Sequence, residues 1–282
     1  MGPATVISGG SGANTAVGVA SLGGRAAFMG KVRADQVGHL FIHDLRATGV
    51  HFPTDPAEHG AATARSFILV TPDGQRSMNT YLGACQGFGP GDVAADVVRA
   101  SAITYLEGYL WDPPAAKEAF KTAAAIAHEA GRKVAITLSD SFCVDRYRDE
   151  FLDLIETRTV DLVFSNEAEL HALYQTADFD TAVAAVRSRC ELCVVTLGAE
   201  GSLVIGADTV TPVPASPIHE LVDTTGAGDL FAAGFLAGYA RGADRVTCAR
   251  LGALAAAEII QHLGARPVKR LDQLAAENEL RI

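Results

Sequence analysis

The chain has 282 residues, of which 49% are hydrophobic and 20% are charged, a balance that excludes an intrinsically disordered or fibrous protein. Its 33 acidic residues outnumber 23 Lys and Arg, and the net charge of −10 argues against nucleic acid as a partner, because nucleic-acid-binding domains carry a basic face. The length suits an α/β fold with a full core, and we predict a single domain over residues 1–282.

Short apolar stretches alternate with longer amphipathic ones along the chain. Repeated strand–helix units indicate a three-layer α/β/α fold, with a mainly parallel central sheet covered on both faces. The apolar periodicity predicts strands at 28–32, 102–106, 134–138, 160–164 and 193–197, helices at 36–49, 113–130, 167–174, 229–239 and 246–262, and a hairpin formed by 202–205 and 210–213.

One region interrupts this alternation. Residues 65–70 and 76–81 are predicted strands joined by a turn that contains Pro72, Asp73 and Gly74. Proline presets φ and glycine accepts a positive φ, so the turn closes a hairpin without a crossover helix. We therefore expect a small antiparallel lid around residues 50–85, folded over a site.

The cysteines and histidines favour neither a disulfide framework nor a metal site. The five cysteines are an odd number without the spacing of small disulfide-rich domains, and Cys190-x-x-Cys193 has no second pair to complete a zinc site. His39 and His43 lie one helical turn apart, but no acid in the metalloprotease pattern stands between them. We expect buried thiols and a solvated helix edge instead.

The segment 223–229, which reads Asp-Thr-Thr-Gly-Ala-Gly-Asp, carries the strongest chemical signal. The backbone amides of Gly226, Ala227 and Gly228 precede a long helix, whose N-terminus favours an anion such as a phosphate. Asp229 stands in the first helical turn. There it either accepts a proton during phosphoryl transfer or serves only as a favourable helix-start residue.

A second glycine loop opens another helix rich in small residues. Gly9 and Gly10 let a ligand approach the backbone, and Asn14 offers both a donor and an acceptor to a hydroxyl-rich ligand. The alternative is a plain tight turn. Glu107, at the end of a predicted strand, either lines a cleft or merely ends the strand.

These segments together resemble the ribokinase-like (PfkB) family of carbohydrate and nucleoside kinases. The signatures are Gly-Gly-x-x-x-Asn at 9–14 and Asp-Thr-Thr-Gly-Ala-Gly-Asp at 223–229. An Asn-x-x-Glu motif at 166–169 and a Thr-x-Gly-x-x-Gly turn at 196–201 are similar to two further family motifs. Within the family, 70–76, 105–112, 138–143 and 262–267 look most like the bacterial adenosine kinases.

The resemblance implies a ribokinase-like fold and transfer of the γ-phosphoryl group of ATP to a primary hydroxyl, first of all the 5′-hydroxyl of adenosine. Two alternatives stay open. One is a sugar kinase of the ribokinase, fructokinase or keto-deoxygluconate kinase type, and the other is an inactive truncated ligand-binding paralogue. The cofactors would be ATP and Mg²⁺, with K⁺ as a candidate. The protein would be cytoplasmic, without nucleic-acid or membrane partners, and a monomer or a homodimer formed through the lid.

The resemblance also implies roles for individual residues. Arg76, on the lid, would contact the phosphates; otherwise it is a solvated strand edge. The other implied roles are catalytic base (Asp229), anion hole (Gly226, Ala227, Gly228), acceptor binding (Gly9, Gly10, Asn14), ATP binding (Asn166, Glu169, Thr196, Gly198, Gly201, Thr225), monovalent cation binding (Asp223) and Mg²⁺ binding through water (Glu169).

One departure from the family pattern concerns the start of the chain. Family members open with a strand whose Asp binds the sugar hydroxyls, whereas only residues 1–7 precede the first glycine loop here. We therefore expect that this N-terminal segment is missing. Aromatic cover for a nucleoside base would come from Phe52, Phe67 and Tyr81.

Overall fold

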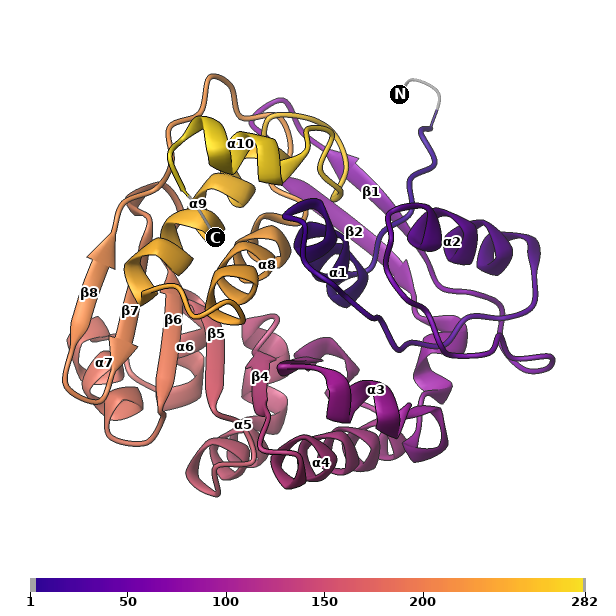
Figure 1. Ribbon diagram of the computed structural model, residues 1–282, viewed down its shortest axis with the longest axis horizontal. Helices are drawn as coiled ribbons and strands as arrows, with labels where there is room; N and C mark the ends of the chain where they lie inside the picture. The colour runs from indigo at the N-terminus through magenta and orange to yellow at the C-terminus, as the bar shows by residue number, and fades with distance from the viewer. Residues whose placement is uncertain (1–3, 281–282) are drawn as a thin grey trace.

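The computed structural model describes residues 4–280 and contains two separate sheets. In the central sheet four parallel strands are followed by two antiparallel ones, and neighbours in the sheet are neighbours in the chain (Figure 1). The six strands are β3 (Ile103–Glu107), β4 (Lys133–Thr137), β5 (Leu162–Asn166), β6 (Leu192–Thr196), β7 (Ser202–Gly206) and β8 (Val210–Val213). The second sheet is the antiparallel hairpin of β1 (Arg65–Val70) and β2 (Arg76–Tyr81).

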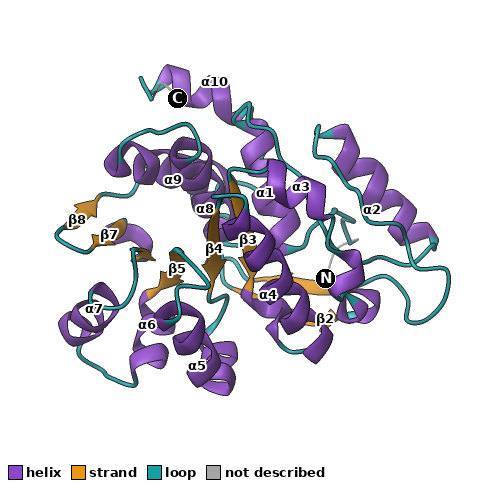
Figure 2. Ribbon diagram, turned by 60° about the horizontal axis from the view of Figure 1, so that its bottom comes forward, coloured by secondary structure: helices purple, strands orange, loops and turns teal. Residues whose placement is uncertain are grey.

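Helices cover both faces of the central sheet, which confirms the three-layer α/β/α prediction (Figure 2). One face carries α4 (Pro114–Glu129), α5 (Ser141–Glu156), α6 (Glu167–Tyr174) and α7 (Phe179–Arg187). The other carries α8 (Ala227–Tyr239) and α9 (Arg245–Ile259), against which α1 (Ser11–Ser21) and α10 (Leu271–Glu277) pack. Helices α2 (Gln36–Ala47) and α3 (Ala95–Ala100) complete the set of α-helices in the described part.

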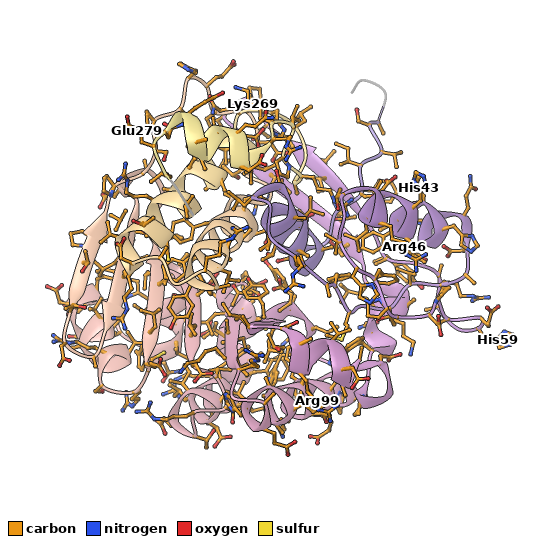
Figure 3. All side chains as sticks on the ribbon, viewed as in Figure 1. His43, Arg46, His59, Arg99, Lys269 and Glu279 are labelled. Carbon is orange, nitrogen blue, oxygen red and sulfur yellow. The ribbon has the colours of Figure 1, made fainter. Side chains whose placement is uncertain are left out.

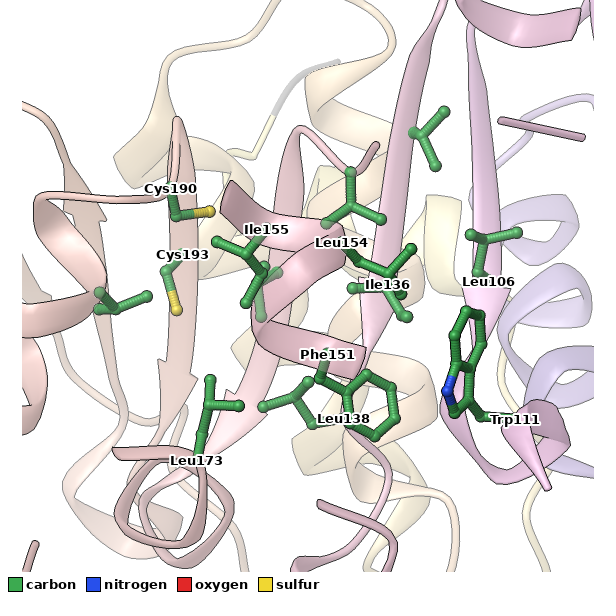
Figure 4. Close-up of a cluster of buried hydrophobic side chains, with 14 of the residues drawn as sticks. Leu106, Trp111, Ile136, Leu138, Phe151, Leu154, Ile155, Leu173, Cys190 and Cys193 are labelled. Carbon is green, nitrogen blue, oxygen red and sulfur yellow. The ribbon is translucent and has the colours of Figure 1, made fainter. Parts of the chain in front are cut away.

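The core lies in two layers, one on each side of the sheet. Ile136 points to one layer and its neighbour Ala135 to the other, as the alternation of a strand requires. Figure 4 shows the first layer, where Trp111 and Phe151 pack with their ring centroids 5.8 Å apart. This contact packs α5 against the turn at Gly108–Trp111 that follows β3.

Small residues let three helices approach closely. A Cβ on Gly234 of α8 would lie 2.4 Å from the carbonyl oxygen of Leu251 on α9. A Cβ on Gly18 of α1 would lie 2.6 Å from the Cβ of Ala233 on α8. Larger residues there would push the helices apart, so Gly234 sets how near α9 comes to α8 and Gly18 sets how near α1 comes to α8.

Most predicted elements are present, but the predicted strand at 28–32 was wrong. Isolated bridges form only at the residues on either side of the segment, where Ala27 pairs with His51 and Arg33 pairs with Ala57. The ring of Phe28 turns instead into an aromatic cluster, stacked 5.9 Å from Phe52. Its hydrophobic residues therefore reflect side-chain packing rather than a strand ladder.

The structure also bears on the expected metal and disulfide chemistry. All five cysteines are free thiols. His43 on α2 projects outward (Figure 3), and 80% of its side chain is exposed. His39 is exposed as well, so the solvated-edge interpretation is confirmed. Within residues 4–280, no helix is long and apolar enough to cross a membrane.

Candidate active site

The N-termini of α1 and α8 converge and bring two sequence-predicted residues together. Each helix is preceded by a glycine with positive φ, Gly10 at 96° and Gly226 at 84°. The amide of Asn14 donates to Oδ2 of Asp229 at 2.8 Å, and the hydroxyl of Ser11 donates to Oδ1 at 2.6 Å. Both oxygens of Asp229 are therefore held by α1.

The loop at 226–228 leaves an open helix N-terminus. The amide of Ala227 donates to the carbonyl of Thr224 at 3.3 Å, whereas within residues 4–280 the amide of Gly228 has no acceptor. A Cβ built on Gly228 would meet nothing within 4 Å. The N-terminus of this 13-residue helix can thus receive an anion beside Asp229.

Asp223 ties this loop to the segment after α9. It is 3% exposed, and its Oδ1 accepts the amide and hydroxyl hydrogens of Thr225 at 2.9 and 2.6 Å. Its Oδ2 accepts the amide hydrogen of Gly264 at 3.2 Å. That segment is held in turn by buried Glu258, which accepts the backbone amides of Val268 and Lys269. Sequence reasoning missed Glu258, since a lone acid inside a helix gives no motif.

The tip of the hairpin closes on the same loop. Arg76 donates through Nη1 to the hydroxyl of Thr224 at 2.6 Å, and this hydroxyl lies 3.3 Å from the carbonyl of Gly74. Figure 1 shows the hairpin on the α1 side of the molecule. The structure therefore brings the exposed side chain of Arg76, on strand β2, into contact with the loop at 223–228, which we call the anion loop. A role of Arg76 towards phosphates stays a prediction.

A second carboxyl, Glu107, lies at the C-terminal end of β3 beside Asp229. Ser139 donates to its Oε1 at 2.5 Å, and Ser11 contacts its Oε2. Burial raises the pKa of Glu107 to about 7, and the charge of Asp229 adds to the rise. Burial also raises the pKa of Asp229, against the opposing effect of its hydrogen bonds to Ser11 and Asn14. We call Ser11, Asn14, Glu107, Ser139 and Asp229 the carboxyl cluster.

Sequence reasoning left Glu107 open and missed Ser11 and Ser139. The available signal was position, because the C-terminal ends of parallel strands form the ligand-binding edge of such sheets. The partners of Glu107 could not be predicted, since Ser11 lies 96 residues away and Ser139 lies 32 residues away.

The Asn-x-x-Glu motif lies at the same sheet edge, after β5. Asn166 caps α6 by accepting the amide hydrogen of Glu169 at 2.9 Å, and Glu169 accepts from the backbone and side-chain nitrogens of Asn166 at 3.0 and 2.6 Å. Burial raises the pKa of Glu169 to about 7. The motif therefore forms a capping box, and both oxygens of Glu169 are engaged in it.

The Thr-x-Gly-x-x-Gly turn joins β6 to β7 next to this motif, because Thr196 pairs with Asn166 across the sheet. Gly198 and Gly201 have φ of 59° and 100°, and a Cβ on Gly201 would lie 2.2 Å from the carbonyl oxygen of Val213. Only glycine fits at position 201. The turn therefore depends on backbone conformations and close contacts that a residue with a side chain does not allow.

Two further observations limit the site. Within residues 4–280, no group of three or more His, Cys, Asp or Glu side chains is arranged to hold a metal ion. A hollow of about 340 Å³, lined in part by Arg158, Arg187, Arg189 and Arg245, lies at the opposite edge of the sheet. Three of these arginines follow or end α5 and α7, where cations stabilise helix C-termini, and none belongs to the candidate site.

Comparison with known proteins agrees with this geometry. The family model described as pfkB family carbohydrate kinase matches residues 4–270. The crystal structure of an adenosine kinase from Sinorhizobium meliloti is 56% identical with a TM-score of 0.97, covering 99% of this chain and 85% of that one. A structure described as a "probable sugar kinase protein" from Rhizobium etli CFN 42 is 54% identical with a TM-score of 0.98, covering 100% of this chain and 85% of that one.

A curated relative from Arabidopsis thaliana, "Probable fructokinase-6, chloroplastic", is 31% identical over 81% of this chain. The match spans 61% of the length of that relative. On the family match, the two glycine-opened helices and the position of Asp229, the chain belongs to the pfkB family of carbohydrate kinases, which are ATP-dependent kinases.

Proposed function

We propose that this chain transfers the γ-phosphoryl group of ATP to the 5′-hydroxyl of adenosine, giving AMP and ADP. The observation that carries the proposal is the position of Asp229 beside the open amide of Gly228. Asp229 would take the proton of the acceptor hydroxyl as the new O–P bond forms, and the amides of 226–228 would hold the charge on the transferred group.

The acceptor would bind in front of α1. Asn14 is 3% exposed, and its Oδ1 has no hydrogen-bond partner within the described part of the chain. A buried acceptor atom without a donor is unfavourable, so a ligand hydroxyl that donates to it would stabilise the complex. A Cβ on Gly9 would meet nothing within 4 Å, which leaves the backbone there open to the acceptor.

ATP would extend from the anion loop towards the other motifs of the sheet edge. Arg76 and Thr225 would contact phosphate oxygens, and the turn at Thr196, Gly198 and Gly201 would contact the nucleotide. Mg²⁺, when bound, supplies positive charge that offsets the phosphates. Asn166 and Glu169 would hold it through water, since the oxygens of Glu169 already accept hydrogen bonds from Asn166.

Two finer assignments belong to the same proposal. We assign a K⁺ site to Asp223 and Thr225, and activity in KCl should exceed activity in choline chloride at equal ionic strength. The chain is either a monomer or a homodimer formed through the hairpin, on which Phe67 is 73% exposed and Met78 is 50% exposed. Light scattering after size-exclusion chromatography decides between these two states.

Similarity to the Sinorhizobium meliloti adenosine kinase, at 56% identity, favours adenosine. A hexose such as fructose is the second candidate, because the Arabidopsis thaliana relative is described as a fructokinase. The base pocket expected from the sequence needs one correction. Phe52 is 3% exposed and packs against Phe28 and Phe41, so only Phe67 and Tyr81 on the hairpin remain free to cover a base.

The test is ADP release with ATP and Mg²⁺ against single acceptors: adenosine, other nucleosides, ribose, fructose and a keto-deoxy sugar. We expect turnover with adenosine. Turnover with one of the sugars and with no nucleoside would make that sugar, and not adenosine, the acceptor. Tight ATP binding without turnover of any acceptor rejects the kinase proposal and favours a ligand-binding protein.

A further inference from the structure

The hydroxyl of Ser11 lies between two carboxyl groups. It is 2.6 Å from Oδ1 of Asp229 and in contact with Oε2 of Glu107. A hydroxyl carries one hydrogen and can donate to only one of them. The remaining oxygen–oxygen contact therefore needs a second hydrogen, which must come from a protonated carboxyl.

The surroundings of Glu107 are built to hold its carboxyl group. Ser139, which donates to it, has a φ of 75°, a left-handed conformation that is uncommon outside glycine and is found where a site demands it. The same hydroxyl accepts the amide hydrogen of Tyr109 at 3.0 Å. A Cβ on Gly108 would lie 2.4 Å from the carbonyl oxygen of Thr137, so the backbone after β3 fits closely against β4.

Four titratable groups face Glu107 from the elements around it. Asp229 comes from α8, Tyr105 from β3, Tyr109 from the turn after β3, and Cys143 from α5. Burial raises the pKa of both tyrosines, and it raises the pKa of Cys143 to about 12. These three groups stay neutral near pH 7, so Asp229 is the charge that Glu107 meets. Asp229 in turn lies within the field of Arg76.

We propose that Glu107 is a positioning residue for phosphoryl transfer: its neutral carboxyl donates to Ser11, Ser11 donates to Asp229, and Asp229 alone carries the negative charge beside the phosphoryl group. This inference rests on the proposed function. The proton of Glu107 stays in place during the reaction, while the proton of the acceptor hydroxyl goes to Asp229. Ionisation of Glu107 removes the donor to Ser11 and places a second negative charge next to an anionic reaction.

The first test is the pH dependence of kcat/KM from about pH 5.5 to about pH 9.5 for the wild type, Glu107→Gln and Glu118→Gln. The wild type should lose activity on the alkaline side with a midpoint near the pKa of Glu107, about 7. Glutamine donates an N–H at every pH, so Glu107→Gln should keep activity within about threefold of the wild-type maximum and lack that alkaline loss. Glu118, an exposed residue of α4, is the matched control and should leave the profile unchanged.

Two outcomes overturn the proposal. An unchanged alkaline loss in Glu107→Gln shows that another group titrates. A folded Glu107→Gln with activity reduced about 100-fold or more at every pH shows that the reaction needs the ionised carboxylate. Ser11→Ala completes the test, because adding Glu107→Gln to it should cause no further change if Glu107 acts through Ser11.

The second test does not use activity. Carbon NMR of ¹³C-labelled glutamate carboxyls should show Glu107 titrating near pH 7 in the nucleotide-free protein, and at lower pH in Asp229→Asn. Titration at the ordinary glutamate value, or no change in Asp229→Asn, overturns the proposal. Failure of the proposed kinase function can be told apart from failure of the Glu107 proposal. In the first case no acceptor is turned over, whatever the NMR titration of Glu107 shows.

Discussion

Two glutamates at the C-terminal edge of the sheet, Glu107 after β3 and Glu169 after β5, have the same raised pKa of about 7 but different surroundings. The oxygens of Glu169 accept hydrogen bonds from Asn166, three residues away, in the capping box of α6. The oxygens of Glu107 contact hydroxyls from two distant segments, and one of these hydroxyls also contacts Asp229.

Glu107 and Glu169 show that burial of a carboxyl can have two different consequences. A carboxyl that satisfies a helix N-terminus stabilises the fold, and its raised pKa follows from its place in the core. In the mechanism that we propose, a carboxyl linked through a hydroxyl to another carboxyl takes part in the electrostatics of the reacting atoms. A raised pKa alone therefore does not say what a carboxyl does. Glu169 is held within its own capping box, from which it would bind Mg²⁺ only through water, whereas Glu107 is linked to Asp229. The predictions below test that distinction.

The largest effect should come from the carboxyl cluster itself. Asp229→Asn removes the proposed proton acceptor and should lower kcat by about 10²–10⁴-fold, with ATP affinity little changed. Steady-state kinetics and calorimetric titration with a non-hydrolysable ATP analogue measure the two effects separately. Asp149→Asn, at an exposed residue of α5, is the control and should leave kcat and ATP affinity unchanged. Wild-type turnover in Asp229→Asn would remove Asp229 from the mechanism.

The next effect is on stability, where both glutamates should behave alike. Each folded-state pKa lies above the ordinary value of 4.5, so each carboxyl contributes stability below pH 4.5 that is lost as pH rises towards 7. Glu107→Gln and Glu169→Gln should each flatten this fall in the free energy of unfolding, by about 1–3 kcal/mol across the interval. Urea unfolding at a series of pH values measures it, and a slope identical to that of the wild type contradicts the burial argument.

A smaller effect tests the contact between the hairpin and the loop at 223–228, where Arg76 donates to Thr224. Arg76→Ala should raise KM for ATP about tenfold, because it removes a cation that can form a bidentate phosphate contact. Thr224→Val alone should have a weaker effect. If the Arg76–Thr224 hydrogen bond positions the guanidinium, the double variant should resemble Arg76→Ala. Fully additive effects on KM would mean that the two side chains act independently.

The smallest effect concerns the capping box, where structure and nucleotide binding can be separated. Asn166→Ala should destabilise the protein by about 1 kcal/mol, and Asn166→Ser, which keeps a capping oxygen, should restore most of that loss. Thermal and urea unfolding measure the stability, and calorimetry measures ATP affinity. If the serine variant regains ATP affinity in full, the Asn166 amide does not contribute to binding beyond its cap.

Local chemistry explains what the sequence predicted well. The Pro72, Asp73 and Gly74 turn led to the correct hairpin, whose strands span the predicted residues, because proline and glycine restrict φ directly. The glycine loops predicted that a helix follows each of them, although α8 begins at Ala227, two residues before the predicted start. Asn14 and Asp229, 215 residues apart in the chain, could be placed in one site only because both motifs resemble those of one family.

The remaining features depend on contacts between distant segments. Residues 28–32 have the composition of a strand, but Phe28 packs with Phe41 and Phe52 and the backbone finds no continuous partner. The role that we propose for Glu107 depends on hydroxyls from α1 and from the turn after β4. Contacts of this kind, between segments far apart in the chain, cannot be predicted from periodicity or spacing in the sequence.

The most direct test of the central claim is a competition in one sample. ³¹P NMR would follow the products when ATP, Mg²⁺, adenosine and fructose are supplied together at equal acceptor concentrations. The account predicts AMP as the phosphorylated product, formed in step with the loss of ATP γ-phosphate. A fructose phosphate as the sole product, or unchanged ATP in the presence of both acceptors, would contradict it.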